Sequence, residues 1–265
     1  MTHSLRYVAI CGACALALAG CAGTLQPQRS AEQPVSQQVT TSDASQRAKV
    51  HTELGSLYLN RGNFGIAQEE ARAALSADEN YAPAHNLMGL VHMQLSENGL
   101  AEASFERGLR LAPDDAEINN SFGWFLCQTG REQRSLQYFD AAIRSPLYTT
   151  PSMPSTNAGI CALRLKDDKR AEDYFSRALR ADSGNDRARY FLADILYRQG
   201  RFEVARQHLV ELHKLVEPTP ETLWLALRVE RKLGDRETEA RLSSQLRRKY
   251  PGSPEVQRLM QGNYE

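Results

Sequence analysis

Residues 54–74 read LGSLYLNRGNFGIAQEEARAA, and the architecture of the chain can be worked out from this segment. Its pattern of small residues returns along the sequence. One track advances in steps of 34, 34, 36 and 34 through Gly55, Gly89, Gly123, Gly159 and Ala193. A second track advances in steps of 34, 34, 36, 34 and 35 through Ala67, Ala101, Ser135, Ala171, Ala205 and Ala240. Two tracks with the same period and the same two-residue insertion indicate a tandem repeat.

Each repeat unit is predicted to be a pair of antiparallel helices. Apolar residues recur at helical spacing, as at Leu192, Ile195 and Leu196. A glycine ends the first helix in four units, because glycine accepts the left-handed conformation at no steric cost. These glycines are Gly62, Gly130, Gly200 and Gly234. A small residue eight places into each unit lets the two helices approach closely. No unit can bury its apolar face alone, so neighbouring units must stack.

The 34-residue unit resembles the tetratricopeptide repeat, and the resemblance covers residues 48 to about 252. It implies an all-α fold, a right-handed superhelix of about six helix-turn-helix repeats over residues 47–252. Residues 253–265 are expected to form a C-terminal capping helix and tail. The sixth repeat is degenerate, because Ala240 comes one residue late and Arg228 occupies the small-residue position.

The N-terminal 21 residues differ in composition from the repeats. Arg6 precedes an apolar, alanine-rich run at 7–20, which is short for a membrane span but suits a signal peptide. The run ends in LAGC at 18–21, which resembles the lipobox of bacterial lipoproteins. The resemblance implies a lipoprotein signal peptide over 1–20 and a lipidated Cys21 at the mature N-terminus. An ordinary signal peptide or N-terminal anchor with an incidental cysteine is the alternative.

Residues 21–46 are expected to comprise the lipidated cysteine and a disordered tether. Gln, Ser, Thr and Pro dominate this segment, which has too few large apolar residues to offset its chain entropy. A flexible coil of this length spans roughly 25–30 Å, enough to hold the folded part off a membrane surface. Ala22 follows Cys21, and by analogy with known sorting preferences this favours a lipid anchor in the outer membrane, on its periplasmic face.

Composition and motifs argue against several classes of function. Lys and Arg number 32 and Asp and Glu number 32, so the charge does not indicate a nucleic-acid partner. The six histidines include His208 and His213, which are five residues apart, but none falls in an HExxH pattern, so no metal site is expected. Nucleophile elbows, phosphate loops and dinucleotide fingerprints are absent from the sequence. We therefore expect no catalytic residues, no cofactor and no small-molecule substrate.

A partner-binding groove is predicted on the inner face of the superhelix, which is lined mainly by the first helix of each repeat. Apolar side chains supply contact area there, and amides can hold the backbone of a ligand. The residues are Leu59, Leu90, Met93 and Trp124, beside Asn86 and Asn120. The alternative is that Trp124 packs between neighbouring helices. Thr52 and Ser56 stand where the carboxylate clamp of chaperone-binding relatives needs Lys and Asn, which disfavours a C-terminal EEVD-type ligand.

The cysteines predict one disulfide. Cys11 and Cys14 leave with the signal peptide and Cys21 carries the lipid, so the mature chain keeps Cys127 and Cys161. Both lie on first helices of neighbouring repeats, near positions twelve and ten, and the expected compartment is oxidising. The alternative is a pair of small, buried, unpaired thiols, since free cysteine packs well between helices.

Two segments point to a narrower family. One is NNSFGWFLC at 119–127, and the other is NAGICAL at 157–163, preceded by PLY at 146–148. Together with the lipobox and the repeat number, they resemble the type IV pilus biogenesis and stability lipoproteins, the PilW/PilF pilotin family. The resemblance implies an outer-membrane lipoprotein that binds secretin subunits and promotes their outer-membrane localisation and multimerisation. The alternative is a tetratricopeptide lipoprotein scaffold that recruits cell-wall hydrolases or outer-membrane assembly factors.

Overall fold

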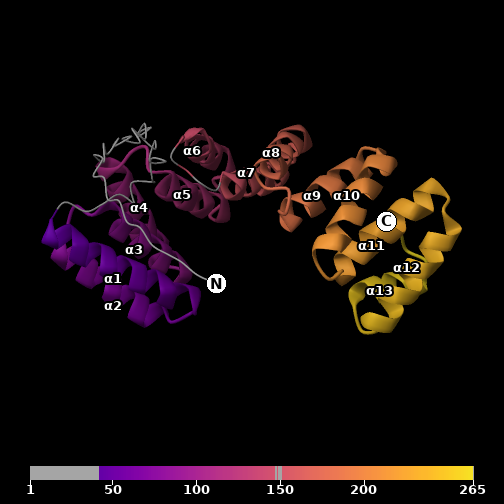
Figure 1. Cartoon of the computed structure of the whole chain (residues 1–265), viewed down its shortest axis with the longest axis horizontal. Helices are drawn as coiled ribbons and strands as arrows, with labels where there is room; N and C mark the ends of the chain where they lie inside the picture. The colour runs from indigo at the N-terminus through magenta and orange to yellow at the C-terminus, as the bar shows by residue number, and fades with distance from the viewer. Residues whose placement is uncertain (1–41, 147, 149–150, 265) are drawn as a thin grey trace, which may run out of the picture. The chain divides into compact units, whose positions relative to one another are not determined.

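The structure, a computed structural model, describes residues 42–146, 148 and 151–264. The predicted signal peptide, Cys21 and the tether up to residue 41 lie outside the described residues. Within the described part the chain forms thirteen α-helices and no strand (Figure 1). The all-α prediction is therefore confirmed.

Twelve of the helices form six antiparallel hairpins. The first helices of the hairpins are α1 (Asp43–Asn60), α3 (Ala82–Gln94), α5 (Ala116–Gln128), α7 (Ser152–Arg164), α9 (Asp186–Arg198) and α11 (Pro220–Leu233). The second helices are α2 (Phe64–Ala77), α4 (Asn98–Leu111), α6 (Glu132–Arg144), α8 (Asp168–Ala181), α10 (Phe202–Leu215) and α12 (Arg236–Lys249). A final helix, α13 (Pro254–Gln261), packs on α11 and α12. Each hairpin packs against the next, so apolar residues of the third to sixth repeats share one large core, and three smaller clusters lie in the first three repeats.

Helix α1 begins inside the segment that composition predicts to be a tether. Ser42 is its N-cap, and the Ser42 side chain accepts a hydrogen bond of 3.1 Å from the backbone N–H of Ser45. Asp43 adds a negative charge in the first turn, where the helix dipole favours it. The hydroxyl of Ser45 also donates to Asp78 at 2.5 Å. The four residues from Asp43 to Gln46 are therefore helical.

The turn between the helices of each hairpin uses a left-handed residue. The predicted glycines have φ of 76°, 78°, 77° and 79° at Gly62, Gly130, Gly200 and Gly234. In the second and fourth hairpins the same position holds Ser96 (φ 62°) and Lys166 (φ 59°). A residue with a Cβ atom is strained in this conformation, so these two turns are less favourable than the glycine turns.

Three hairpins are held close by a phenylalanine ring that lies on a glycine. A Cβ atom added to Gly159 would lie 2.6 Å from the ring of Phe175, and one added to Gly89 would lie 2.7 Å from the ring of Phe105. Gly123 and Phe139 form the third such pair. The second helix can therefore approach the first only because the facing residue has no side chain.

The register expected for the sixth repeat is wrong on the first helix. In the third repeat the small residue Gly123 lies seven positions before the turn glycine Gly130. Gly234 is the corresponding turn glycine in the sixth repeat, and seven positions before it stands Leu227, not Arg228. Leu227 is fully buried, whereas Arg228 is partly exposed. The repeat therefore continues in register, but a large residue occupies the small-residue position.

On the second helix of the sixth repeat, the buried position also lies one residue earlier than the alignment of small residues places it. Ala240 is exposed, and the buried position belongs to Glu239. Arg231 and Arg236 lie 2.7 Å and 2.9 Å from the carboxylate oxygens of Glu239. A carboxylate can be buried here because two guanidinium groups satisfy it.

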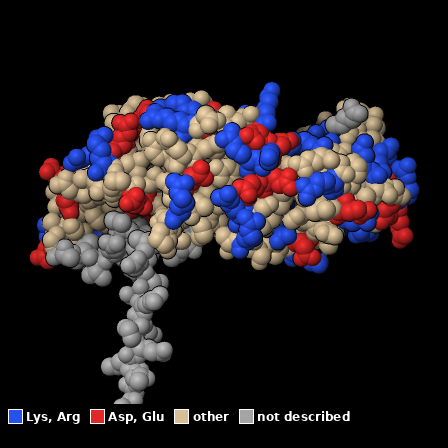
Figure 2. Space-filling view, turned by 90° about the horizontal axis from the view of Figure 1, so that it is seen from above, with Lys and Arg blue, Asp and Glu red and all other residues tan. Residues whose placement is uncertain are grey.

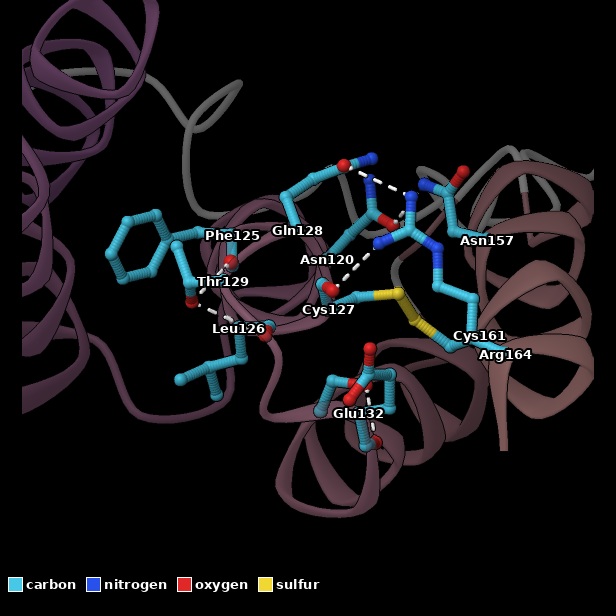
Figure 3. Close-up of a disulfide and its surroundings, with 11 residues drawn as sticks. Asn120, Phe125, Leu126, Cys127, Gln128, Thr129, Glu132, Asn157, Cys161 and Arg164 are labelled. Carbon is cyan, nitrogen blue, oxygen red and sulfur yellow. Dashed lines mark hydrogen bonds between the residues drawn. A yellow bond between two sulfur atoms is a disulfide. The ribbon is translucent and has the colours of Figure 1, made fainter. Parts of the chain in front are cut away.

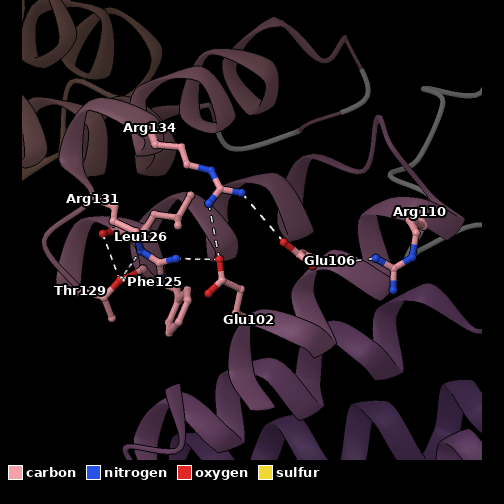
Figure 4. A network of polar contacts seen from close by, with 8 residues as sticks. All are labelled: Glu102, Glu106, Arg110, Phe125, Leu126, Thr129, Arg131 and Arg134. Carbon is pink, nitrogen blue, oxygen red and sulfur yellow. Dashed lines mark hydrogen bonds and ion pairs between the residues drawn. The ribbon is translucent and has the colours of Figure 1, made fainter. Parts of the chain in front are cut away.

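Charges of both signs are interspersed over the face of the molecule seen in Figure 2. One network links α4 to α6 (Figure 4), in which Glu102 lies 2.6 Å from Arg131 and 3.5 Å from Arg134. Glu106 lies 3.9 Å from both Arg134 and Arg110. These side chains are partly exposed, so each pair adds little to the free energy of unfolding, and the apolar core remains the main source of stability.

Candidate partner-binding groove

A cavity of about 410 Å³ opens between α1 and α3. Asn86 and Leu90, two of the predicted groove residues, line it. They share it because they lie four residues apart on α3 and so occupy one face of the helix. The other predicted residues lie elsewhere on α1, α3 and α5 and do not line this cavity: Leu59, Met93, Asn120 and Trp124.

Asn86 has an unused hydrogen-bond acceptor. Its side chain is 9% exposed, and its Oδ1 is buried without a partner among the described residues. An unpaired buried acceptor costs about 1–3 kcal/mol. Oδ1 is itself buried, so a ligand can use this acceptor only if the amide turns toward the cavity. An N–H group that meets Oδ1 there would remove this cost, so the amide favours binding of a peptide backbone.

The cavity is lined by more acidic than basic groups. Glu53 and Glu117 line it, and Lys49 lies 3.9 Å from Glu53. Tyr81 also lines the cavity, and burial, followed by the charges of Glu53 and Asp115, raises the pKa of its phenol to about 12. Tyr81 is therefore protonated at neutral pH. The lining suits a ligand that presents N–H donors or positive charge.

Thr52 and Ser56 also line this cavity, at the positions where a carboxylate clamp would need Lys and Asn. The Thr52 hydroxyl donates to the carbonyl of Ala48 at 2.7 Å, and the Ser56 hydroxyl donates to the carbonyl of Thr52 at 2.8 Å. Both donors are used within α1. Neither hydroxyl is therefore free to donate to a ligand carboxylate, which agrees with the sequence argument against a carboxylate clamp.

The apolar groove residues also pack on the core. Leu59 is partly buried against the core between α2 and α3. Leu90 and Met93 pack against a cluster that contains Phe105 and Phe122. Their partly exposed surfaces can contact a ligand, but their truncation would also disturb the fold.

Trp124 agrees in part with each of the two predictions from the sequence: a residue of the groove, or a residue packed between neighbouring helices. Its ring is partly buried against the core of the later repeats, as the packing alternative requires. The guanidinium groups of Arg164 and Arg187 lie 6.0 Å and 5.9 Å from the ring centroid. The remaining surface of the ring is therefore flanked by positive charge, which sequence reasoning did not anticipate.

Asn120 is already engaged by the next repeat. Its Oδ1 accepts a hydrogen bond of 3.0 Å from the side chain of Asn157 on α7, which Figure 3 shows beside it. Its Nδ2 lies 3.7 Å from the sulfur of Met153. A ligand would have to compete for this amide, unlike that of Asn86. The two-residue insertion before α7 breaks the 34-residue spacing, so the spacing alone does not identify Asn157 as the partner of Asn120.

Cys127 and Cys161 meet between α5 and α7, where the structure joins them as a disulfide (Figure 3). Their Cα atoms are 6.0 Å apart, within the range that a disulfide needs, and both side chains are fully buried. Arg164 donates hydrogen bonds to the backbone carbonyl of Cys127 at 2.8 Å and to the side chain of Gln128 at 3.0 Å. The junction of the third and fourth repeats is therefore tied by polar contacts as well. Formation of the bond in the protein stays a prediction.

Among the described residues, no group of His, Cys, Asp and Glu is arranged to hold a metal ion. His51 instead lies 2.6 Å from Glu70, and His92 lies 2.5 Å from Glu97. None of the helices in the described ranges is long and apolar enough to cross a membrane.

Six stacked helix hairpins with this spacing define a tetratricopeptide-repeat protein. The profile of the family described as "Tetratricopeptide repeat" matches residues 43–216. The type IV pilus assembly protein PilF of Pseudomonas aeruginosa is 30% identical over 207 residues, which cover 78% of this chain and 82% of that protein. The chain therefore belongs to the PilF family of tetratricopeptide-repeat proteins.

Two solved structures agree with this assignment. Pseudomonas aeruginosa PilF aligns with a TM-score of 0.77 and 28% identity, over 83% of this chain and 100% of that one. PilW, described as a widely conserved type IV pilus biogenesis factor, aligns with a TM-score of 0.71 and 29% identity, over 80% of this chain and 98% of that one. The similarity extends over most of the repeat array, which confirms the predicted family resemblance.

Proposed function

We propose that the chain is a pilotin: a lipid-anchored protein of the outer membrane that binds secretin subunits and promotes their localisation and multimerisation in type IV pilus biogenesis. The observation that carries the proposal is the similarity to PilF and PilW, which covers 83% and 80% of the chain. Other tetratricopeptide-repeat proteins also align over 61–72% of the chain, but with only 15–17% identity. The 28–29% identity of PilF and PilW over at least 80% of the chain supports a shared role in pilus assembly.

The groove gives this function a physical mechanism. An unassembled secretin subunit exposes strand edges, which are liable to pair wrongly. An edge presents backbone N–H groups, and the unpaired Oδ1 of Asn86, once its amide turns toward the cavity, can accept one of them beside the apolar surface of Leu90. The chain needs no nucleotide or metal for this role. A lipid at Cys21 would hold the groove near the membrane and raise the local concentration of the bound subunit.

Recovery of partners from detergent-solubilised envelope tests the groove. Asn86→Ala combined with Leu90→Ala should lower secretin recovery at least tenfold, because both changes remove contacts at the cavity. Circular dichroism must show that the helices are kept, because Leu90 also packs on the core. The matched control is Leu100→Ala on α4, whose side chain is 56% exposed and outside the cavity. Recovery of a cell-wall hydrolase or a barrel assembly factor instead of a secretin would favour the alternative scaffold function.

The anchor is tested separately. Cys21→Ser should release the protein from the outer-membrane fraction, since the lipobox then lacks the thiol that would carry the lipid. If the variant still floats with outer membranes in a density gradient, the lipid anchor is not what holds it there.

A further inference from the structure

The chain folds back onto its last repeat after α13. Gly262 ends α13 in the left-handed conformation (φ 69°) and redirects the backbone. The ring of Tyr264 then stacks on the indole of Trp224, with centroids 5.6 Å apart and ring planes 14° apart. The guanidinium carbon of Arg231 lies 3.9 Å from the centroid of the same ring. The Nε of Arg228 donates a hydrogen bond of 2.8 Å to the backbone carbonyl of Tyr264. The last described residue is therefore held by its ring and by its backbone.

A cavity of about 660 Å³ remains open beside these residues, and its lining is cationic. Arg228, Arg231, Lys232 and Arg236 line it together with Tyr197 and the folded-back residues. Glu239 pairs with Arg231 and with Arg236. Among the described residues, no carboxylate forms an ion pair with Arg228 or Lys232. Two positive charges without a carboxylate partner among the described residues thus lie next to the aromatic stack, and the guanidinium of Arg228 also covers the ring of Tyr197, with its carbon 4.4 Å from the centroid.

We propose that this face of α11 is a binding site for an extended acidic peptide with an aromatic residue, and that residues 262–264 act as its intramolecular competitor. The aromatic side chain would take the place of Tyr264 on Trp224, and the backbone carbonyl would bind Arg228. Carboxylates next to the aromatic residue would meet Arg228 and Lys232. The sequence places Glu265 directly after Tyr264, so the chain carries the aromatic and acidic chemistry that the site recognises.

This site differs in place and in chemistry from the groove around Asn86. The groove lies on α1 and α3 and has the acidic side chains Glu53 and Glu117 in its lining, whereas the second site lies on α11 and has a cationic lining. The two sites would therefore select segments of opposite charge. A covalently attached competitor has an effective concentration in the millimolar range, so a partner peptide must bind well to displace it.

Release of the competitor should uncover the site. The probe is the pentapeptide QGNYE with an N-terminal fluorescein, followed by fluorescence anisotropy. Tyr264→Ala removes the ring that occupies the site, and this variant should bind the probe at least tenfold more tightly than the unaltered protein. Addition of Arg228→Gln should abolish the gain. Probes with Ala in place of Tyr, or with Gln in place of Glu, should bind at least tenfold more weakly.

A second variant keeps every contacting side chain. Gly262→Val places a β-branched residue at a left-handed position, so it should release residues 263 and 264 and also strengthen probe binding. Circular dichroism shows whether each variant keeps its helices. The proposal is overturned if a folded variant binds the probe no more tightly than the unaltered protein. It is also overturned if both variants lose helix content, because residues 262–264 would then be part of the fold and not a competitor.

Discussion

The contact between Phe175 and Gly159 makes a simple substitution informative. In Gly159→Ala the new Cβ atom would lie 2.6, 2.7 and 2.8 Å from three ring carbons of Phe175. Ordinary carbon contacts are about 3.5–4.0 Å, so the ring must move by about 1 Å. The ring is fully buried and stacks on Phe191 with centroids 5.4 Å apart, so its movement would disturb packed neighbours. Overpacking of this kind costs about 1–3 kcal/mol.

The same change elsewhere isolates the steric cost. Gly99 lies in α4, and a Cβ added there would meet nothing within 4 Å. Gly99→Ala should therefore gain about 0.5–1 kcal/mol from reduced backbone entropy of the unfolded chain. Urea denaturation followed by circular dichroism gives the free energy of unfolding of each variant. The two glycine-to-alanine variants should differ by about 1–3 kcal/mol, with Gly159→Ala the less stable.

The fifth repeat suggests how the cost can be relieved. There Ala193 and Leu209 occupy the positions of Gly159 and Phe175, with the same separation of 16 residues, and both are buried. Phe175→Leu should therefore make room for the methyl group of Gly159→Ala. A double-mutant cycle should give a favourable coupling of about 1–2 kcal/mol. If Gly159→Ala is as stabilising as Gly99→Ala, or if the coupling is zero, the ring does not limit the approach of the helices.

Three further predictions concern a turn, the cysteines and the histidines. Lys166→Gly should raise the free energy of unfolding by about 1 kcal/mol in urea, because its φ of 59° strains any residue with a Cβ atom; a loss of stability would show that the lysine has another role. Denatured, unreduced protein should show no reactive thiol at Cys127 or Cys161. Reduction should lower the free energy of unfolding by about 3–4 kcal/mol, because the bond joins residues 34 positions apart and so restricts the unfolded chain. Two reactive thiols in fresh material would refute the bond. Burial lowers the pKa of His208 and His213, so the folded state favours their neutral form. Their contribution to the free energy of unfolding is fully present above about pH 6.5 and is lost as the pH falls below that value. Urea midpoints should therefore fall between about pH 7.5 and about pH 5, and replacing both histidines with Gln should flatten this trend; a wild-type midpoint that does not change with pH would contradict it.

The fold could be predicted from the sequence because its main determinants are local. A glycine that ends a helix, such as Gly130, acts within one turn, and the 34-residue period repeats it. The register of the sixth repeat could not be found by aligning small residues, because Leu227 and Glu239 stand where the other repeats have small residues. The turn glycine Gly234 keeps the period and was the better guide. The start of α1 was missed because Ser42 caps a helix in a segment whose average composition is typical of disorder.

The site was less predictable, because it depends on which side chains of neighbouring helices each residue contacts. Spacing along one helix placed Asn86 and Leu90 correctly in the same cavity. It gave no sign that Asn120 would bond to Asn157 across the insertion. Nor did it indicate that Tyr264 would return to α11, since no repeat position marks that contact. Contacts between repeats that break the period need the three-dimensional arrangement.

The stacking of neighbours has a mechanical consequence. The main contacts between described helices join elements that are next to each other or next but one along the chain. A protein built this way, pulled from its two ends, would lengthen in steps of one hairpin, since the loss of one hairpin leaves its more distant neighbours intact. A bond between Cys127 and Cys161, which are 34 positions apart, would keep the segment between them from extending. At about 3.4 Å per extended residue, the fully stretched chain would then be about 110 Å shorter in its oxidised form than in its reduced form.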